Sequence, residues 1–271
     1  MRRALLIVNP YSTSVTGDAI RAVEEALRER VDVRTAFTQR PGHATELASE
    51  LAGETDGIVV FSGDGTYNEA LNGADGAVPF GFLPGGGTSV LPRALGLPRD
   101  PVEAARRVGA ALAEERGRRI SLGRGPGGVR PGDAQFAWMF ARMVVERRGR
   151  WEPQLEVDGV GRAAFLLVAN GNPYSYAGRL PLRIAPDARF DGGLDLVAPT
   201  RVRPRDIPFL VSYVMRGKGN LDARGVHVRH DVDRFEVRCD VPLPLQADGE
   251  DLGDVESAVF EVERDAVSVL L

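Results

Sequence analysis

The stretch Ile58–Glu69, IVVFSGDGTYNE, decides the fold. Its first four residues form an apolar run of the kind found in a parallel strand that is buried on both faces. A glycine-rich turn at Ser62–Gly65 follows, and the pattern is then helical through Asn72. In a parallel sheet this order places the turn at the carboxyl edge, where ligands bind. Glycines allow close backbone approach and the helix start offers free N–H donors, which favours a phosphate site over a plain tight turn.

The same alternation of strand and helix extends to both sides of this stretch. Four short apolar or alternating runs predict strands, and amphipathic runs between them predict helices. An alternating order of this kind predicts an α/β domain with a parallel sheet and flanking helices. The predicted strands are Ala4–Val8, Val31–Phe37, Gly57–Phe61 and Pro79–Leu83; the predicted helices are Gly17–Arg30, His43–Ala52, the run ending at Asn72, and Asp100–Arg116.

The second half of the chain has a different pattern. Most of its segments are short, turn-bounded runs that predict strands, and Phe235–Val241 alternates strictly between apolar and charged residues. One helix is predicted near Arg205–Met215, and its apolar part is expected in the core, with a lipid-facing surface as the alternative. These features are typical of an antiparallel β-sandwich domain. The other predicted strands are Arg162–Ala169, Leu180–Ala185, Gly193–Ala198, Val226–Arg229 and Val255–Glu263.

The composition excludes several classes of protein. With 271 residues, 43% hydrophobic and 27% charged, the chain has the composition of a globular protein rather than a disordered or fibrous one. The single cysteine, Cys239, excludes an intramolecular disulfide and a cysteine zinc cluster, and its alternation with apolar residues predicts a buried side chain. A net charge of −4 argues against nucleic acid as a partner. No apolar run is long enough for a membrane helix, so we expect a cytoplasmic protein.

Two further loops are predicted at the same sheet edge. Pro84–Ser89 carries three consecutive glycines directly after a predicted strand, and Asn9-Pro10 is followed by the hydroxyl residues Ser12, Thr13 and Ser14. Because the carboxyl ends of parallel strands meet at one edge, the three loops together predict a site for the phosphates of a nucleotide. For Pro84–Ser89 the alternative is a flexible connector.

These motifs resemble the catalytic domain of the diacylglycerol-kinase-type lipid kinases, a family that includes bacterial lipid kinases, sphingosine kinases and ceramide kinases. The resemblance extends in order over nearly the whole chain. Its motifs are specific as a set and weak singly. They are Asn9-Pro10, Ser62–Thr66 with Asn68-Glu69 and Asn72-Gly73, Pro84–Ser89 with Arg93–Gly96, Pro186–Ala188 with Asp191–Leu194, and Leu243–Glu250.

The resemblance implies an ATP- and Mg²⁺-dependent lipid kinase that phosphorylates a hydroxyl of diacylglycerol or a related lipid, in phospholipid biosynthesis. Residues 1–122 would form the nucleotide-binding catalytic domain and 123–255 the β-sandwich substrate domain, with Gly123–Gly132 as linker and a tail of about 256–271 returning to the first domain. The kinase would be cytoplasmic and transiently at the inner face of the membrane, with ATP and a lipid as substrates; a homodimer stays open.

The resemblance also implies roles for individual residues. Glu250 would be the base that receives the acceptor proton, with Asp248 orienting it or binding magnesium, and Asp64 would be the third catalytic residue. Asp191, Ala188 and Gly193 would hold a structural magnesium ion. The nucleotide contacts would come from Asn9, Thr38, Ser62, Gly63, Asp64, Gly65, Thr66, Asn68, Gly86, Gly87 and Thr88.

The chain departs from the family pattern at several points. Ser62 stands where most members have a glycine, Ser89 stands where an asparagine is usual, and the loop Tyr11–Thr16 lacks the usual glycine and basic residue. The largest departure follows Gln135, where a segment with a Phe-x-Asn motif, a Gly-x-Asp pair and a connecting helix is missing. These departures favour a catalytically impaired nucleotide- or lipid-binding module as one alternative. An NAD-kinase-like enzyme is the other, because such enzymes share the glycine-aspartate loop.

Overall fold

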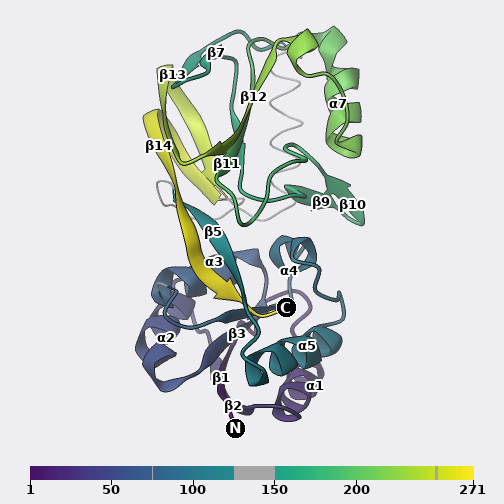
Figure 1. Ribbon diagram of the computed structural model, residues 1–271, viewed down its shortest axis with the longest axis vertical. Helices are drawn as coiled ribbons and strands as arrows, with labels where there is room; N and C mark the ends of the chain where they lie inside the picture. The colour runs from purple at the N-terminus through teal and green to yellow at the C-terminus, as the bar shows by residue number, and fades with distance from the viewer. Residues whose placement is uncertain (75, 125–149, 248–249) are drawn as a thin grey trace. The chain divides into compact units, whose positions relative to one another are not determined.

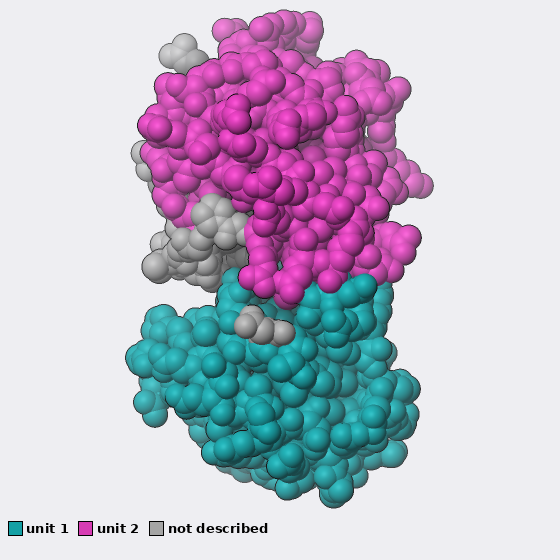
Figure 2. All heavy atoms as spheres, turned by 60° about the vertical axis from the view of Figure 1, so that its left-hand side comes forward, with its two compact units in different colours: residues 1–120, 265–271 teal, residues 121–264 magenta. Residues whose placement is uncertain are grey.

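The computed structural model describes residues 1–74, 76–124, 150–247 and 250–271. It divides into two compact units (Figure 2): unit 1 is Met1–Ile120 with Asp265–Leu271, and unit 2 is Ser121–Arg264. Strand β14 (Glu250–Val269) contributes residues to both units. Most of the predicted linker Gly123–Gly132, and the position of the predicted missing segment after Gln135, lie outside the described residues.

Unit 1 is built on a parallel sheet. Its strands β1 (Arg3–Val8), β2 (Asp32–Phe37), β3 (Gly57–Ser62) and β4 (Phe80–Pro84) lie in the order β2-β1-β3-β4. All neighbouring pairs are parallel. Strand β14 also lies parallel beside β4, where Val269 pairs with Phe80. Every residue of β3 and β4 is buried, which explains why their sequences are continuous apolar runs rather than alternating ones.

Helices cover both faces of this sheet (Figure 1). The pair α1 with α5 and the pair α2 with α3 each pack together, on opposite sides. Two helix starts are capped by side chains, since Thr16 accepts the N–H of Ala19 at 3.2 Å and Asp100 accepts that of Glu103 at 2.8 Å. The helices are α1 (Gly17–Arg28), α2 (His43–Leu51), η1 (Ala52–Glu54), α3 (Asp64–Ala74), α4 (Val90–Ala94) and α5 (Pro101–Ala113).

Unit 2 is an antiparallel β-sandwich, as predicted. One sheet has the order β14-β13-β6-β7 with β5 beside β14, a second has the order β12-β11-β8, and β9 pairs with β10. Apolar residues of β6 and β13 pack against those of β11, which makes the core between the two larger sheets. The strands are β5 (Arg118–Arg124), β6 (Leu155–Val157), β7 (Gly161–Ala163), β8 (Leu167–Ala169), β9 (Ser175–Ala177), β10 (Leu180–Leu182), β11 (Leu194–Pro199), β12 (Val226–Val232) and β13 (Arg234–Ala247).

The predicted single strand Arg162–Ala169 is wrong in detail. The chain forms two strands there, β7 and β8, which belong to different sheets. Ala163 and Ala164 are consecutive and both fully buried, a pattern that a strand with one wet face does not allow. The predicted alternation of Phe235–Val241 holds at its start, but Val241 is exposed and Cys239 is only half-buried.

The predicted helix of the second half is α7 (Ile207–Arg216), flanked by the short turns η2 (Pro204–Asp206) and η3 (Asp222–Arg224). Its inward residues pack on the sheet that contains β11, and they include Phe209, Leu210, Tyr213 and Val214. Among the described residues, no helix is long and apolar enough to cross a membrane.

Candidate phosphate-binding site of unit 1

Three loops of unit 1 meet at the carboxyl edge of its sheet and are joined by backbone hydrogen bonds. Ser14 in the loop after β1 donates its N–H to the carbonyl of Gly85 in the loop after β4, at 2.9 Å. Gly85 in turn donates to the carbonyl of Ser62 at the end of β3, at 2.7 Å. The loops that the sequence placed at one edge therefore form one connected structure.

A hydroxyl network lies at the centre of these loops. The Ser62 hydroxyl oxygen is 2.8 Å from that of Ser12 and donates to the Thr66 hydroxyl at 2.7 Å. The amide nitrogen of Asn9 donates to the same Thr66 oxygen at 3.2 Å. Ser62 is fully buried, so the hydroxyl that replaces the usual glycine hydrogen-bonds to neighbouring side chains. The network brings three of the predicted nucleotide-contacting residues together and fixes their side chains.

The glycines of the loops differ in what surrounds them. A Cβ on Gly86 would lie 2.7 Å from the Cα of Gly63, and a Cβ on Gly85 would lie 3.0 Å from the nitrogen of Ser62. Backbone atoms cannot yield easily, so these positions require glycine for packing alone. A Cβ on Gly87 would meet no atom within 4 Å, and Gly87 is exposed. Its backbone therefore faces open space, where a phosphate can approach closely.

Asp64 is the first residue of α3, and its carboxylate caps another helix. One oxygen accepts the N–H of Val90 at 2.9 Å and the other accepts the N–H of Leu91 at 3.0 Å. Ser89 precedes α4 in a left-handed conformation (φ 45°) and supplies no side-chain cap, so Asp64 takes that part. Asp64 thus has a structural role in addition to the roles that the sequence predicted for it. The two oxygens retain further lone pairs that a cation or hydroxyl can still use.

Tyr67 is a residue of this site that the sequence analysis missed. Its buried hydroxyl lies 2.6 Å from the carbonyl oxygen of Ser62 and 2.6 Å from that of Leu83, so it joins the ends of β3 and β4. Burial, and next the charge of Asp64, raise the pKa of the Tyr67 phenol above its usual range, and the proton stays on the oxygen. A tyrosine among small and apolar buried positions of α3 is the signal that could have found it.

The remaining predicted nucleotide-contacting residues lie around these loops. Thr38 is buried and donates its N–H to the carbonyl of Val8 at 2.9 Å, and Thr88 is half-buried, with its carbonyl accepting from Arg93 at 3.2 Å. Gly65 and Asn68 are half-buried in the first turns of α3. The structure thus gathers the N-terminal candidates in one unit, while their contacts with a nucleotide stay a prediction.

The predicted catalytic pair is described only in part. Glu250 is the first residue of β14 and pairs in register with Ala247 of β13, which gives a hairpin at this point. Asp248 and Gly249 lie outside the described residues. The roles of Glu250 and Asp248 therefore stay predictions.

The predicted magnesium site in unit 2 stays a prediction. The Asp191 carboxylate accepts two hydrogen bonds from the Arg189 guanidinium, at 2.9 and 2.8 Å. The N–H of Gly193 donates to Asp231 at 2.7 Å, and this bond lowers the pKa of the Asp231 carboxyl, with Arg264 adding to the effect. Ala188 is buried, and the described part of the chain contains no group of three or more acidic, histidine or cysteine side chains around one point. A magnesium ion at Asp191 would share the carboxylate with Arg189 or compete with it.

Comparison with protein families agrees with this architecture. Residues 3–124 match the family model described as the diacylglycerol kinase catalytic domain. Residues 127–271 match the model described as the YegS C-terminal NAD kinase beta sandwich-like domain. Together the two matches define a two-part architecture of a kinase catalytic domain followed by a β-sandwich. The chain belongs to the diacylglycerol kinase-like lipid kinase family.

Individual relatives match the first part of the chain. A diacylglycerol kinase of Bacillus subtilis is 36% identical over 111 residues, which cover 38% of this chain and 36% of that protein. A sphingoid long-chain bases kinase 1 of Arabidopsis thaliana is 33% identical over 119 residues, which cover 38% of this chain and 15% of that protein. The matched region thus spans about a third or less of these relatives' length.

A solved structure shares the fold over nearly the whole chain. The crystal structure of a diacylglycerol kinase from Bacillus anthracis superposes with a TM-score of 0.77 and covers 99% of this chain and 96% of that chain. The sequence identity is 19%, so the likeness is one of fold.

Proposed function

We propose that this chain is a kinase that transfers the γ-phosphoryl group of ATP, as its Mg²⁺ complex, to a hydroxyl of diacylglycerol or a related lipid. The observation that supports it best is the loop arrangement in unit 1. Gly63 and Gly86 pack backbone against backbone, and the adjacent Gly87 backbone faces open space at the carboxyl edge of the sheet. This arrangement lies inside the segment that matches the diacylglycerol kinase catalytic domain.

In this proposal the chain acts mainly by positioning, because phosphoryl transfer asks little covalent chemistry of the protein. The backbone near Gly87 and Thr88 would contact the phosphates. Asp64 holds the Val90–Ala94 helix against α3, and the Ser62–Thr66–Asn9 network fixes the neighbouring loop. Both sets of bonds preorganise the loops before the nucleotide binds.

Glu250 is proposed as the base, on the resemblance of the Asp248–Glu250 segment to the family motif. As the acceptor oxygen forms its bond to the γ-phosphorus, the hydroxyl proton passes to the Glu250 carboxylate and ADP leaves. Asp248 is proposed to orient Glu250 or the metal that accompanies ATP. Asp191, with Ala188 and Gly193, is proposed to hold a structural magnesium ion, which would compete with Arg189 for the carboxylate.

The lipid substrate implies further proposals about the setting. A kinase without a membrane-spanning helix among its described residues would reach a lipid by transient contact with the membrane surface. The proposed location is the cytoplasm and the inner face of the membrane, and the proposed role is in phospholipid biosynthesis. A homodimer is compatible with this proposal.

A second candidate function is a nucleotide- or lipid-binding module without turnover. Ser89 favours it, because its buried hydroxyl bonds back to the N–H and carbonyl of Gly86, both at 3.2 Å. Ser89 stands where the family pattern has an asparagine, and these bonds keep its hydroxyl from contacting a nucleotide. An NAD-kinase-like activity is a third outcome, suggested by the name of the sandwich family.

The experiment is a transfer assay with γ-labelled ATP and Mg²⁺, offering diacylglycerol, a sphingoid base and NAD separately, with calorimetric titration of ATP on the same preparation. Label in diacylglycerol supports the proposal, and label in the sphingoid base changes the substrate. Label in NAD alone replaces the proposed lipid kinase activity with an NAD-kinase-like activity. ATP binding without transfer to any acceptor replaces it with the binding module.

A further inference from the structure

The outward side of α7 carries an apolar stripe that is exposed among the described residues of the chain. Pro208, Val211 and Met215 are exposed at spacings of three and four residues, which places them along one side of the helix. Val211 is 52% exposed and Met215 is 43% exposed. The opposite side, with Tyr213, is buried in the sandwich. The helix is therefore fixed in place by its inner residues and presents the others to the surroundings.

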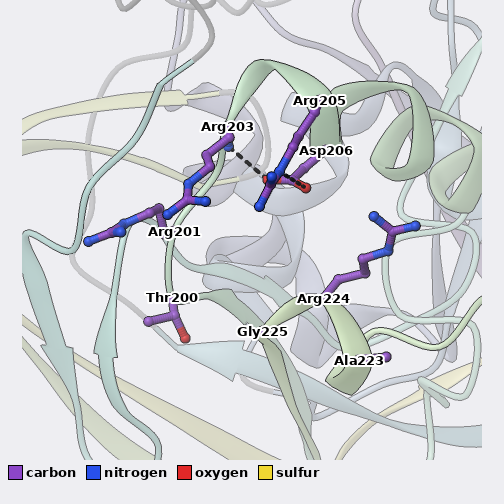
Figure 3. A pocket seen from close by; sticks show the side chains of 8 residues that line it. All are labelled: Thr200, Arg201, Arg203, Arg205, Asp206, Ala223, Arg224 and Gly225. Carbon is purple, nitrogen blue, oxygen red and sulfur yellow. Dashed lines mark hydrogen bonds and ion pairs between the residues drawn. The ribbon is translucent and has the colours of Figure 1, made fainter.

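The surface beside this stripe is strongly basic. Between Arg201 and Arg224 the sequence holds six basic and two acidic residues, although the whole chain has a net charge of −4. A pocket of about 300 Å³ opens there (Figure 3). Four guanidinium groups and one carboxylate line it, from Arg201, Arg203, Arg205, Arg224 and Asp206.

Acidic partners neutralise only part of this charge. Arg201 forms an ion pair with Glu152 at 2.6 Å, and Asp206 lies 3.9 Å from the Arg205 guanidinium. Asp206 also accepts the backbone N–H of Arg203 at 3.0 Å, which holds the turn η2 that carries these arginines. The pocket therefore keeps a positive surplus that suits a phosphate, for which guanidinium groups offer paired donors.

The basic pocket is joined to helix α7 through an inward-facing residue of that helix. The guanidinium carbon of Arg224 lies 4.8 Å from the centre of the Phe209 ring, and Phe209 belongs to α7. A cation above an aromatic face is attracted to it, so this contact fixes a wall of the pocket to the helix. The turn η2, with Arg205 and Asp206, also leads directly into α7, so the pocket lies at the start of the helix that carries the exposed apolar side chains.

We infer that this surface docks unit 2 onto membranes that contain anionic phospholipid. Val211 and Met215 enter the boundary between headgroups and acyl chains, and the arginine pocket receives a headgroup phosphate. A phospholipid surface presents phosphate groups next to acyl chains, which matches the arginine pocket and the apolar side of α7. A helix that lies in the membrane interface inserts its apolar side by about 5–10 Å. The inference rests on the proposed function, since a membrane-borne substrate is the reason for docking.

Co-sedimentation with vesicles tests the inference without any catalysis. The probes are vesicles of phosphatidylcholine alone and of phosphatidylcholine with phosphatidylglycerol. The wild-type protein should sediment with the second and far less with the first, and raised salt should release it. Val211→Asp and the pair Arg203→Glu with Arg205→Glu should each lower the partition coefficient by about tenfold or more.

Matched variants control for charge and for exposed apolar area. Val241→Asp changes a 55% exposed valine of β13, and Arg99→Glu reverses an exposed arginine of unit 1; both should sediment like the wild type. Thermal melts should show that all these variants are folded. Failure of the wild type to sediment, or a Val211→Asp variant that sediments like Val241→Asp, overturns the inference. Competition by soluble glycerol phosphate with no effect of Val211→Asp also overturns it, in favour of a soluble anion.

A further measurement separates docking from catalysis. Val211→Asp should phosphorylate a water-dispersed short-chain diacylglycerol as fast as the wild type, and lose rate only on vesicles. If the short-chain lipid is not phosphorylated but the wild type sediments, the proposed function fails and docking stands. Phosphorylation on vesicles that is unchanged by Val211→Asp contradicts docking and leaves the proposed function intact.

Discussion

The carboxylate of Asp64 accepts the backbone N–H of Val90 across 26 residues of sequence, with a donor–acceptor distance of 2.9 Å. Its second oxygen binds the next N–H, at 3.0 Å. Asp64, which is proposed as a catalytic residue, is thus also the cap of α4. A negative charge at the start of a helix stabilises the helix. If Asp64 also acts in catalysis, as proposed, stability and activity are coupled at this residue.

Asp64→Ala should cost both activity and stability. The variant leaves two N–H groups of α4 without their acceptor, and the loss of a helix cap typically costs about 0.5–2 kcal/mol. Asp64→Asn keeps one carbonyl oxygen and should lie between alanine and the wild type in the free energy of unfolding. Urea denaturation measures both variants, beside the transfer assay. An alanine variant with the wild-type denaturation midpoint would show that the two bonds to Val90 and Leu91 do not stabilise the protein.

Gly86→Ala and Gly87→Ala form a matched pair. The methyl group at position 86 would meet the Gly63 backbone at 2.7 Å, so we expect destabilisation of about 1–3 kcal/mol and loss of ATP binding. The methyl group at position 87 meets open space, so the fold should persist. If phosphates approach that backbone, ATP affinity should fall by about tenfold, worth about 1.4 kcal/mol. Unchanged ATP affinity in a folded Gly87→Ala variant, measured by calorimetry, would place the phosphates elsewhere.

Tyr67→Phe removes a single buried hydroxyl. The carbonyl groups of Ser62 and Leu83 lose their shared donor, and we expect a loss of about 1–2 kcal/mol in the free energy of unfolding. Tyr11→Phe is the control, because Tyr11 is 81% exposed and should tolerate the change. Equal denaturation midpoints for the two variants would show that the Tyr67 hydroxyl does not hold the strand ends together.

Glu250→Gln and Asp248→Asn should reduce phosphoryl transfer and leave ATP affinity nearly unchanged. Losing a proton acceptor typically costs about a hundred- to ten-thousand-fold in rate. Asp254→Asn, an exposed carboxyl group on the same strand, is the control and should remain active. Full activity in the first two variants would remove the assignment of the base, and loss of ATP binding would assign the pair to the nucleotide.

Magnesium without nucleotide should raise the melting temperature of the wild type only slightly, because the ion competes with Arg189 for the Asp191 carboxylate. Arg189→Ala removes this competitor, and a larger rise with magnesium in this variant would reveal a metal site at Asp191. Equal behaviour of the two proteins leaves Asp191 as an ordinary ion-paired residue. A clear rise in the melting temperature of the wild type alone would show that the Arg189–Asp191 ion pair does not hinder metal binding.

Local signals predicted much of unit 1. The apolar run at Ile58–Phe61 has no polar face because both faces of β3 are covered, and periodicity alone therefore indicates a buried parallel strand. The caps at Thr16 and Asp100 lie next to the helices that they begin, so the sequence carries them directly. The edge shared by the three loops follows from strand direction.

What the sequence could not predict depends on contacts between distant segments. The bond from Asp64 to Val90 requires two loops to be correctly placed in space, and no spacing rule relates the two residues. The break between β7 and β8 arises because the chain passes from one sheet to the other at Ala164. On α7 the sequence favoured core over a lipid-facing surface for the apolar run, yet Val211 and Met215 are exposed because only one side of the helix meets the sandwich.

The division of β14 between the units has a consequence for biogenesis. Leu270 donates its N–H to the carbonyl of Phe80 at 2.7 Å, and Val269 pairs with Phe80, so the tail covers the open edge of β4. A ribosome delivers that tail only after all of unit 2 has emerged. Until then β4 is an uncovered edge of a nascent sheet, the kind of edge that recruits other chains. Chaperone occupancy during translation should therefore last until the tail reaches β4, and shortening the tail should turn a folding intermediate into an aggregating product.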